Sequence, residues 1–363
     1  MSTRRFTAIA AFQQIFCREN PKAVFPIEIV GVKLFSALKN FAHLCYMKFK
    51  GTIPIQKIDE LNGIKLFIQR EDLRHPFISG NKWWKLKYNI EEAKKQKAHT
   101  LLTFGGAFSN HLAATSFAGK EHGFKTIAIV RGEEVENATL SFCKEQGMGL
   151  RFVSREEYKL KNSERSEVRQ PADESGVWVI PEGGANEFGV KGCAEILDER
   201  ANEFDYIIAP CGTANTLSGL IISSKEQHKI LGFPVLKGAE FLQKDIEKNL
   251  QYFSSNKKNW QLIFDYHFGG YAKINDELIS FILDFQQRYK IPLDAVYTGK
   301  MMYGVFDLIG KIFNFFKGEK VNKNENSNKY LSPRHCTRCS VLRAQERASN
   351  FFMSLAPFFP LPF

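Results

Sequence analysis

Residues 101–111 read LLTFGGAFSNH, and this stretch decides the fold class. The β-type run from Leu101 to Phe104 leads into a glycine turn, and Ser109 and Asn110 are residues that often begin a helix. A strand that passes through a tight turn into a helix is the repeating unit of parallel α/β proteins. The stretch therefore predicts one such unit.

The same alternation extends in both directions along the chain. Strands are expected at 64–68, 126–130, 150–153, 177–180, 206–209 and 230–233, and helices at about 82–96 and 138–147. Because the expected strands are apolar over most of their length, helices should cover both faces of the sheet. The predicted fold class is α/β, and ligands should bind in the loops after Phe104, Ile180 and Ala209, where strands end.

The net charge of +11 lies entirely in the two ends of the chain. Residues 1–50 hold 8 basic and 2 acidic side chains, residues 317–363 hold 8 and 3, and residues 51–316 hold 34 of each. A nucleic-acid enzyme carries its basic surface on the folded, working part. We therefore expect no nucleic-acid partner.

The seven cysteines are odd in number and scattered, which favours a reducing cytoplasm over a disulfide framework. Cys336 and Cys339 form one Cys-x-x-Cys pair, but a zinc site needs a second pair at suitable spacing, so no metal is expected. No apolar run reaches the roughly 18 residues of a membrane helix.

The loop after Ala209 has the outline of a phosphate cradle. Residues 210–219 read PCGTANTLSG, and an apolar helix follows. Small residues let backbone N–H groups approach an anion, and the positive end of the helix dipole points to the same place. The loop lacks the Gly-Lys-Ser/Thr of ATP-binding loops and the Gly-x-Gly-x-x-Gly of dinucleotide-binding loops, so ATP and NAD are disfavoured as ligands. Alone, such a turn is also compatible with a purely structural role.

A lysine at the start of a helix is the second candidate feature. Residues 79–87 read SGNKWWKLK, which places Lys82 directly after a turn formed by Gly80 and Asn81. The helix dipole disfavours a cation there and so helps to supply the neutral amine that a Schiff base needs. Alternatively, Lys82, Lys85 and Lys87 form a solvated helix face.

Two later motifs, HFGGY at 267–271 and DAVYTGK at 294–300, are each compatible with a packing role. Together with TIPI at 52–55, REDLRHP at 70–76 and PEGGAN at 181–186, however, all these segments resemble the 1-aminocyclopropane-1-carboxylate deaminase and D-cysteine desulfhydrase family of pyridoxal 5'-phosphate (PLP) enzymes. The likeness spans about residues 52–316. It implies a tryptophan synthase β-like fold of two open α/β domains, with PLP between them and the small domain at about 97–165.

The resemblance also implies roles for individual residues. Lys82 matches the lysine that forms the Schiff base, and Lys85 matches the lysine near the cofactor phosphate. Ser109 matches the serine that contacts the substrate, and Asn110 matches the amide beside the phenolic oxygen of PLP. Tyr271 and Tyr297 match the active-site tyrosines. The segment that matches the phosphate loop is Gly212, Thr213, Ala214, Asn215 and Thr216.

Thr298 corresponds to the residue beside the pyridine nitrogen, where deaminases of the family usually have glutamate. A hydroxyl stabilises a pyridinium less than a carboxylate does, which suits elimination of a good leaving group. The predicted function is therefore D-cysteine desulfhydrase-like α,β-elimination that gives pyruvate, ammonia and sulfide, by a homodimer acting on a small amino acid. Aminocyclopropane-carboxylate deaminase and a catalytically impaired PLP-binding relative remain as alternatives.

The two ends of the chain depart from the family pattern. Residues 1–50 form an N-terminal extension that precedes the usual start of the family. Family members usually finish with a strand and a His-Thr-Gly-Gly-type loop, whereas residues 317–363 form a divergent tail without a glycine after Gly318. If that last strand is absent, the sheet loses an element and the cofactor site loses a wall.

Overall fold

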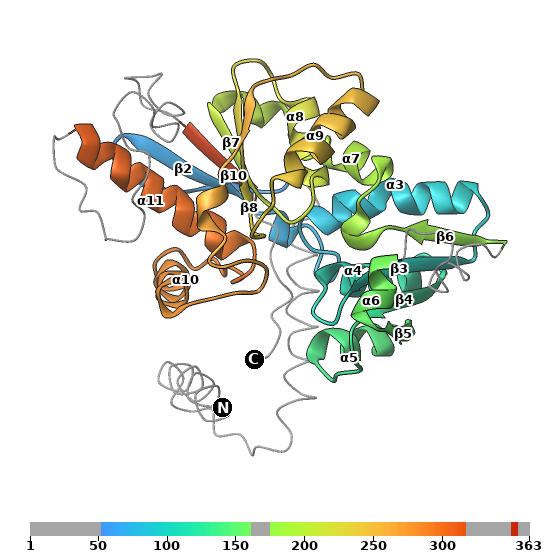
Figure 1. Cartoon of the computed structure of the whole chain (residues 1–363). Coiled ribbons are helices and arrows are strands. Elements are labelled where there is room, and N and C mark those ends of the chain that lie inside the picture. The colour runs from blue at the N-terminus through green and yellow to red at the C-terminus, as the bar shows by residue number, and fades with distance from the viewer. Residues whose placement is uncertain (1–51, 161–174, 317–349, 355–363) are drawn as a thin grey trace.

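A computed structural model describes residues 52–160, 175–316 and 350–354 (Figure 1). The extension before residue 52 and the Cys336–Cys339 pair lie outside the described residues. The described strands form a six-stranded sheet in the order β1-β2-β10-β7-β8-β9 and a four-stranded sheet in the order β5-β4-β3-β6. The strands are β1 (Ile55–Leu61), β2 (Ile64–Gln69), β3 (Thr100–Gly106), β4 (Lys125–Arg131), β5 (Gly149–Val153), β6 (Val177–Ile180), β7 (Tyr206–Cys211), β8 (Lys229–Pro234), β9 (Trp260–Leu262) and β10 (Asn350–Ser354).

Helices connect most of these strands. All neighbouring strands pair in parallel except β1 and β2, which pair antiparallel. This confirms the predicted α/β class, and each predicted strand is present. The helices are α3 (Asn81–Lys95), α4 (Asn110–Glu121), α5 (Ala138–Glu145), α6 (Arg155–Lys159), α7 (Glu187–Cys193), α8 (Asn215–Ser223), α9 (Phe241–Tyr252), α10 (Asp276–Tyr289) and α11 (Thr298–Phe316).

The large sheet is buried on both faces because successive side chains of a strand point to opposite sides. In β7, Ile208 packs in one core with Met301 of α11 and Phe285 of α10. Its neighbour Ile207 packs in the other core, with residues of α8 and α9 such as Leu217. Figure 1 shows α10 and α11 on one side of this sheet and α7, α8 and α9 on the other.

A strand from the divergent tail completes the large sheet. Strand β10 lies between β2 and β7 and pairs in parallel with both, with Phe352 opposite Phe67 and Ile207. Met353 is fully buried in the core that contains α10 and α11. Although residues 317–363 depart from the family pattern in sequence, they thus supply a central strand.

The small sheet lies beside α3 and carries α4, α5 and α6 (Figure 1). Strand β3 is central, and Leu101 packs with the apolar face of α3 and with Ala114 of α4. Leu102 points to the opposite face, where it packs near Tyr158 of α6. The predicted insertion of about residues 97–165 contains β3, β4 and β5, whereas β6 comes from the chain after it.

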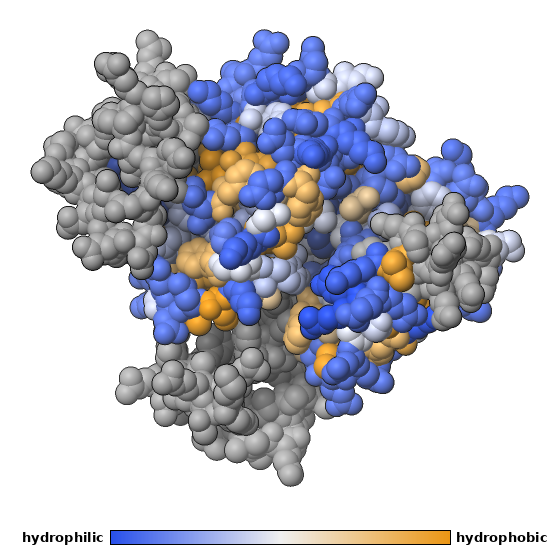
Figure 2. Space-filling model, viewed as in Figure 1, coloured by the Kyte–Doolittle hydropathy of each residue, from blue (hydrophilic) through white to orange (hydrophobic). Residues whose placement is uncertain are grey.

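Among the described residues, no helix is long and apolar enough to cross a membrane. The face of the molecule in Figure 2 is mostly hydrophilic, with smaller apolar areas between the polar side chains.

Candidate active site

Lys82 occupies the second residue of α3, as the sequence predicts. The preceding Gly80 has φ +61°, a left-handed conformation that glycine adopts without strain, and it provides no side-chain cap. The residue is half-buried, but its amine is enclosed by protein. This burial, followed by repulsion from Lys85, lowers the pKa of Lys82 to about 7. A substantial fraction of the amine is therefore neutral near neutral pH.

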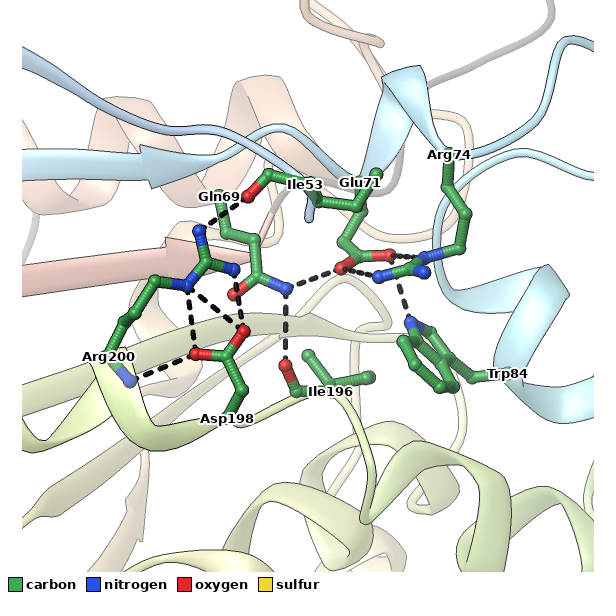
Figure 3. Close-up of polar contacts among 8 residues, drawn as sticks. All are labelled: Ile53, Gln69, Glu71, Arg74, Trp84, Ile196, Asp198 and Arg200. Carbon is green, nitrogen blue, oxygen red and sulfur yellow. Dashed lines mark hydrogen bonds and ion pairs between the residues drawn. The ribbon is translucent and has the colours of Figure 1, made fainter. Parts of the chain in front are cut away.

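A buried carboxylate holds the segment that leads into α3 (Figure 3). Glu71 is fully buried, and its side chain accepts hydrogen bonds from Arg74 at 2.8 Å and from the Trp84 indole at 2.9 Å. Gln69 also donates to Glu71, and the same amide donates to the Ile196 carbonyl at 3.1 Å. The network ties the end of β2 to the first turns of α3 and so fixes the position of Lys82.

Lys85 lies one helical turn after Lys82 and is buried. Its Nζ donates to the Thr213 hydroxyl at 3.0 Å and to the Gly183 carbonyl at 3.1 Å. One of its three N–H groups is left for another acceptor. The structure thus places Lys85 against the loop that the sequence marks as a phosphate cradle.

That loop joins β7 to α8. Its helix begins after Ala214, which has no side chain that could cap the helix. Asn215 donates to the carbonyls of Gly184 at 3.2 Å and Asn186 at 2.7 Å, so its amide is committed to the neighbouring loop. Thr216 accepts a hydrogen bond from Asn81 at 2.9 Å, which joins the starts of α8 and α3.

The Ser109 loop brings polar groups to the start of α4. Ser109 is the N-cap residue, yet its side chain makes no cap hydrogen bond. Gly105 is required beneath it, because a Cβ there would lie 2.9 Å from the Cβ and Oγ of Ser109. The buried Oδ1 of Asn110 has no hydrogen-bond partner within the described part of the chain.

His111 is buried beside the two lysines and presents an unused acceptor. The Thr103 hydroxyl donates to the Ile180 carbonyl at 2.9 Å, so the 2.9 Å contact between this hydroxyl and His111 Nε2 requires the imidazole N–H to donate. Its Nδ1 is then an acceptor, and it has no partner among the described residues. Burial, Lys82 and Lys85 hold the pKa of His111 well below its usual range, so the ring is neutral.

The two predicted tyrosines lie together. The rings of Tyr271 and Tyr297 meet edge to face with centroids 6.1 Å apart. Burial, followed by the neighbouring Tyr271, raises the pKa of Tyr297. The Tyr297 ring also approaches the loop that joins β7 to α8, because a Cβ at Gly212 would lie 2.8 Å from it. Tyr271 is 42% exposed, which leaves it at the surface of the site.

Thr298 is buried at the first residue of α11. Its hydroxyl is 2.6 Å from the Asp294 carboxylate, a contact that the sequence alone did not indicate. Asp294 is buried, and its negative charge raises the pKa of Lys82. The starts of α11 and α3 therefore influence each other electrostatically.

Sequence reasoning did not identify Cys193. Its thiol is buried, and this burial raises the pKa of Cys193 to about 11. The positive charges of Lys85 and Lys82 oppose the shift and so make it smaller. The thiol reaches this position because α7 packs closely on α3: a Cβ at Gly192 would lie 1.9 Å from the Trp84 carbonyl oxygen. In the sequence, only the two glycines at 189 and 192 indicated that another segment packs closely against this helix.

Comparisons with known proteins identify the family of the chain. A family model described as "Pyridoxal-phosphate dependent enzyme" matches residues 47–312. A putative 1-aminocyclopropane-1-carboxylate deaminase of Pyrococcus furiosus is 31% identical over 71% of this chain and 84% of its own length. An Arabidopsis thaliana protein named bifunctional D-cysteine desulfhydrase/1-aminocyclopropane-1-carboxylate deaminase, mitochondrial, is 28% identical over 72% of this chain and 71% of its length.

A solved structure, described as an ACC deaminase homologue, superposes with a TM-score of 0.64 at 26% sequence identity. The match covers 87% of this chain and 94% of that chain.

Proposed function

The chain belongs to the family of pyridoxal-phosphate dependent enzymes, and from this membership we propose that it is a lyase that eliminates sulfide from D-cysteine. The overall reaction converts D-cysteine and water into pyruvate, ammonia and hydrogen sulfide. The proposal draws on the bifunctional Arabidopsis relative and on the threonine at position 298.

One observation carries the assignment of the cofactor to this site. The Lys82 amine is buried at an uncapped helix N-terminus, with its pKa lowered to about 7. Nucleophilic attack on an aldehyde needs an uncharged amine, and the ordinary lysine pKa of about 10.4 does not supply it at neutral pH.

The surrounding residues fit the groups of PLP. The third N–H of Lys85 and the uncapped start of α8 suit an anionic phosphate. The N–H group of the Asn110 amide is the donor that suits the phenolic oxygen, whereas its buried Oδ1, which lacks a partner among the described residues, is an acceptor. When bound, PLP withdraws electrons from the Cα of the substrate.

In this proposal each residue of the chain has a distinct task. Lys82, once released, takes the Cα proton of D-cysteine and holds it at Nζ. The Ser109 hydroxyl and the N–H groups at the start of α4 orient the substrate carboxylate. The edge-to-face pair of Tyr271 and Tyr297 lies near the loop that joins β7 to α8, with Tyr271 at the surface of the site, where it limits the entry of water. The thiolate then leaves from Cβ.

Deamination of aminocyclopropane carboxylate is the second candidate function. It is favoured by the name of the Pyrococcus relative, which is the most similar of the relatives cited above. Thr298 argues for elimination as the faster reaction, because a hydroxyl alone gives a pyridinium less charge stabilisation than the glutamate usual in deaminases.

Two measurements test the proposal. Purified protein, incubated separately with D-cysteine, L-cysteine and aminocyclopropane carboxylate, should release sulfide and pyruvate from D-cysteine faster than it forms 2-oxobutyrate. Borohydride reduction followed by peptide mass spectrometry should find a phosphopyridoxyl group on Lys82. A label on another lysine, or a faster deaminase reaction, contradicts the corresponding part of the proposal.

The proposed assembly is a homodimer in a reducing cytoplasm. In the part of the chain that the structure describes, Cys143, Cys193 and Cys211 are buried free thiols, which suits a reducing compartment. Ile279 and Leu283 lie one turn apart on α10 and are exposed, which suits a protein interface. Sedimentation at several concentrations should give twice the chain mass.

A further inference from the structure

The carboxylate of Asp294 receives four hydrogen bonds at the start of α11. Its Oδ1 accepts from the backbone N–H groups of Val296 at 2.9 Å and Tyr297 at 2.6 Å. Its Oδ2 accepts from the backbone N–H of Thr298 at 2.9 Å and from the Thr298 hydroxyl at 2.6 Å. Burial raises the pKa of Asp294, whereas hydrogen bonds of this kind stabilise the ionised form.

The Thr298 hydroxyl is thereby committed in one direction. It accepts a hydrogen bond from the backbone N–H of Asp294 at 2.8 Å, and its single hydrogen lies on the 2.6 Å contact to the carboxylate. The alternative acceptor, the Asp294 carbonyl, is 3.5 Å away. A hydroxyl has one hydrogen and two lone pairs. What Thr298 has left to offer a ligand is therefore one lone pair.

We propose that Asp294 is a positioning residue that makes Thr298 an acceptor backed by negative charge, so that the pair holds a protonated ring nitrogen on the cofactor. This inference rests on the proposed function, because it takes that nitrogen to lie against Thr298. Asp294 then supplies, from behind the hydroxyl, part of the charge that a glutamate at position 298 would supply directly.

A consequence for substrates follows. A protonated ring withdraws electrons more strongly, which helps the more demanding opening of a cyclopropane ring. The protein should therefore accept aminocyclopropane carboxylate as a second, slower substrate, and this activity should depend on Asp294 more than sulfide release does.

Asp294→Asn is the matched test, because asparagine caps a helix about as well as aspartate but has no charge. With cofactor labelled with ¹⁵N in the ring, the nitrogen signal of the variant should move from the protonated toward the unprotonated position. Deamination should fall roughly tenfold more than D-cysteine elimination, the scale of one lost charge-assisted hydrogen bond. Thr298→Val should shift the signal in the same direction, and Asp294→Asn in that background should shift it no further. Thr298→Ser should retain the signal of the unchanged protein.

The outcomes separate the two proposals. If Lys82 carries the borohydride label but neither Asp294→Asn nor Thr298→Val moves the ¹⁵N signal, this inference is overturned and the proposed function stands. If Lys82 carries no label, the proposed function fails. The pair can then still be tested in the cofactor-free protein, by ¹³C spectra of protein whose aspartate carboxyl groups are labelled. The signal that disappears in Asp294→Asn belongs to Asp294, and at neutral pH it should have the chemical shift of an ionised carboxylate. A protonated shift overturns the inference.

Discussion

Helices α3, α4 and α8 begin at the candidate site without a side-chain cap, whereas α5 and α10, which begin elsewhere, are each capped by an asparagine. The side-chain oxygen of Asn137 accepts a hydrogen bond from the backbone N–H of Leu140, and that of Asn275 accepts one from the backbone N–H of Leu278. Ser109 has a hydroxyl that could cap α4 but does not use it. Helix α9 also lacks a cap hydrogen bond, but a negatively charged residue, Glu240, stands at its start.

The difference teaches where the structure leaves room for anions. The first N–H groups of a helix need partners, and a side-chain cap is the usual one. At the starts of α4 and α8 the first N–H groups remain available to a carboxylate or a phosphate from a ligand, whereas at α3 the N–H groups of Lys82 and Trp83 donate to the carbonyls of Ser79 and Gly80. The start of α11 differs again, because Asp294 satisfies its N–H groups with a carboxylate of the chain itself.

The largest expected effect tests the uncapped start of α3. Lys82→Ala should abolish turnover and the visible absorbance of bound cofactor, because it removes the amine that attaches PLP and moves the proton. Lys87→Ala is the matched control on the same helix, since Lys87 pairs with Glu195 at the surface. Assays of sulfide release and absorption spectra check both variants. Substantial turnover in Lys82→Ala would remove the special role of this helix start.

The second prediction concerns pH. Because burial and Lys85 lower the pKa of Lys82 to about 7, the amine is mostly protonated below that pH and mostly neutral above it. The rate at which cofactor-free protein attaches PLP should therefore fall roughly fiftyfold from pH 7 to pH 5 and level off above about pH 8. Stopped-flow absorbance across this range measures it. A rate that keeps rising to pH 10 would mean that the amine has an ordinary pKa.

A third prediction sharpens the role of the α8 start. Lys85→Met removes the ammonium that bonds to Thr213 and Gly183 but keeps most of the buried volume. We expect PLP affinity to fall by about tenfold or more, the scale of one charge-assisted hydrogen bond, while the bound fraction stays attached to Lys82. Equilibrium dialysis measures the affinity, and borohydride labelling measures the attachment. Unchanged affinity would mean that Lys85 has only a structural role.

The smallest effect is also the most direct comparison of the two kinds of helix start. Asn275→Ala should lower the free energy of unfolding by about 1 kcal/mol, because it removes a cap, and should leave KM unchanged. Ser109→Ala should change stability little, because its hydroxyl does not cap, but should raise KM for D-cysteine several-fold. Urea unfolding and steady-state kinetics on both variants check this. The comparison breaks if both variants lose stability to the same extent.

The local pattern predicted much of the fold. The strand from Leu101 to Phe104 and the helix that carries Lys82 are visible in the sequence because periodicity and turn residues act between near neighbours. Strand β10 was not predictable in this way. Its partners in β2 and β7 are distant in sequence, and residues 350–354 have no strong turn signals around them.

The sequence by itself determined the α/β class, the family, and the lysine, serine and glycine motifs, because these depend on residue types at short spacing. Only the tertiary structure decided that Asp294 stands behind Thr298, that His111 offers its Nδ1 beside two lysines, and that Cys193 lies near them. The physical reason is that burial and hydrogen-bond direction depend on which distant segments meet. The composition of each segment does not contain that information.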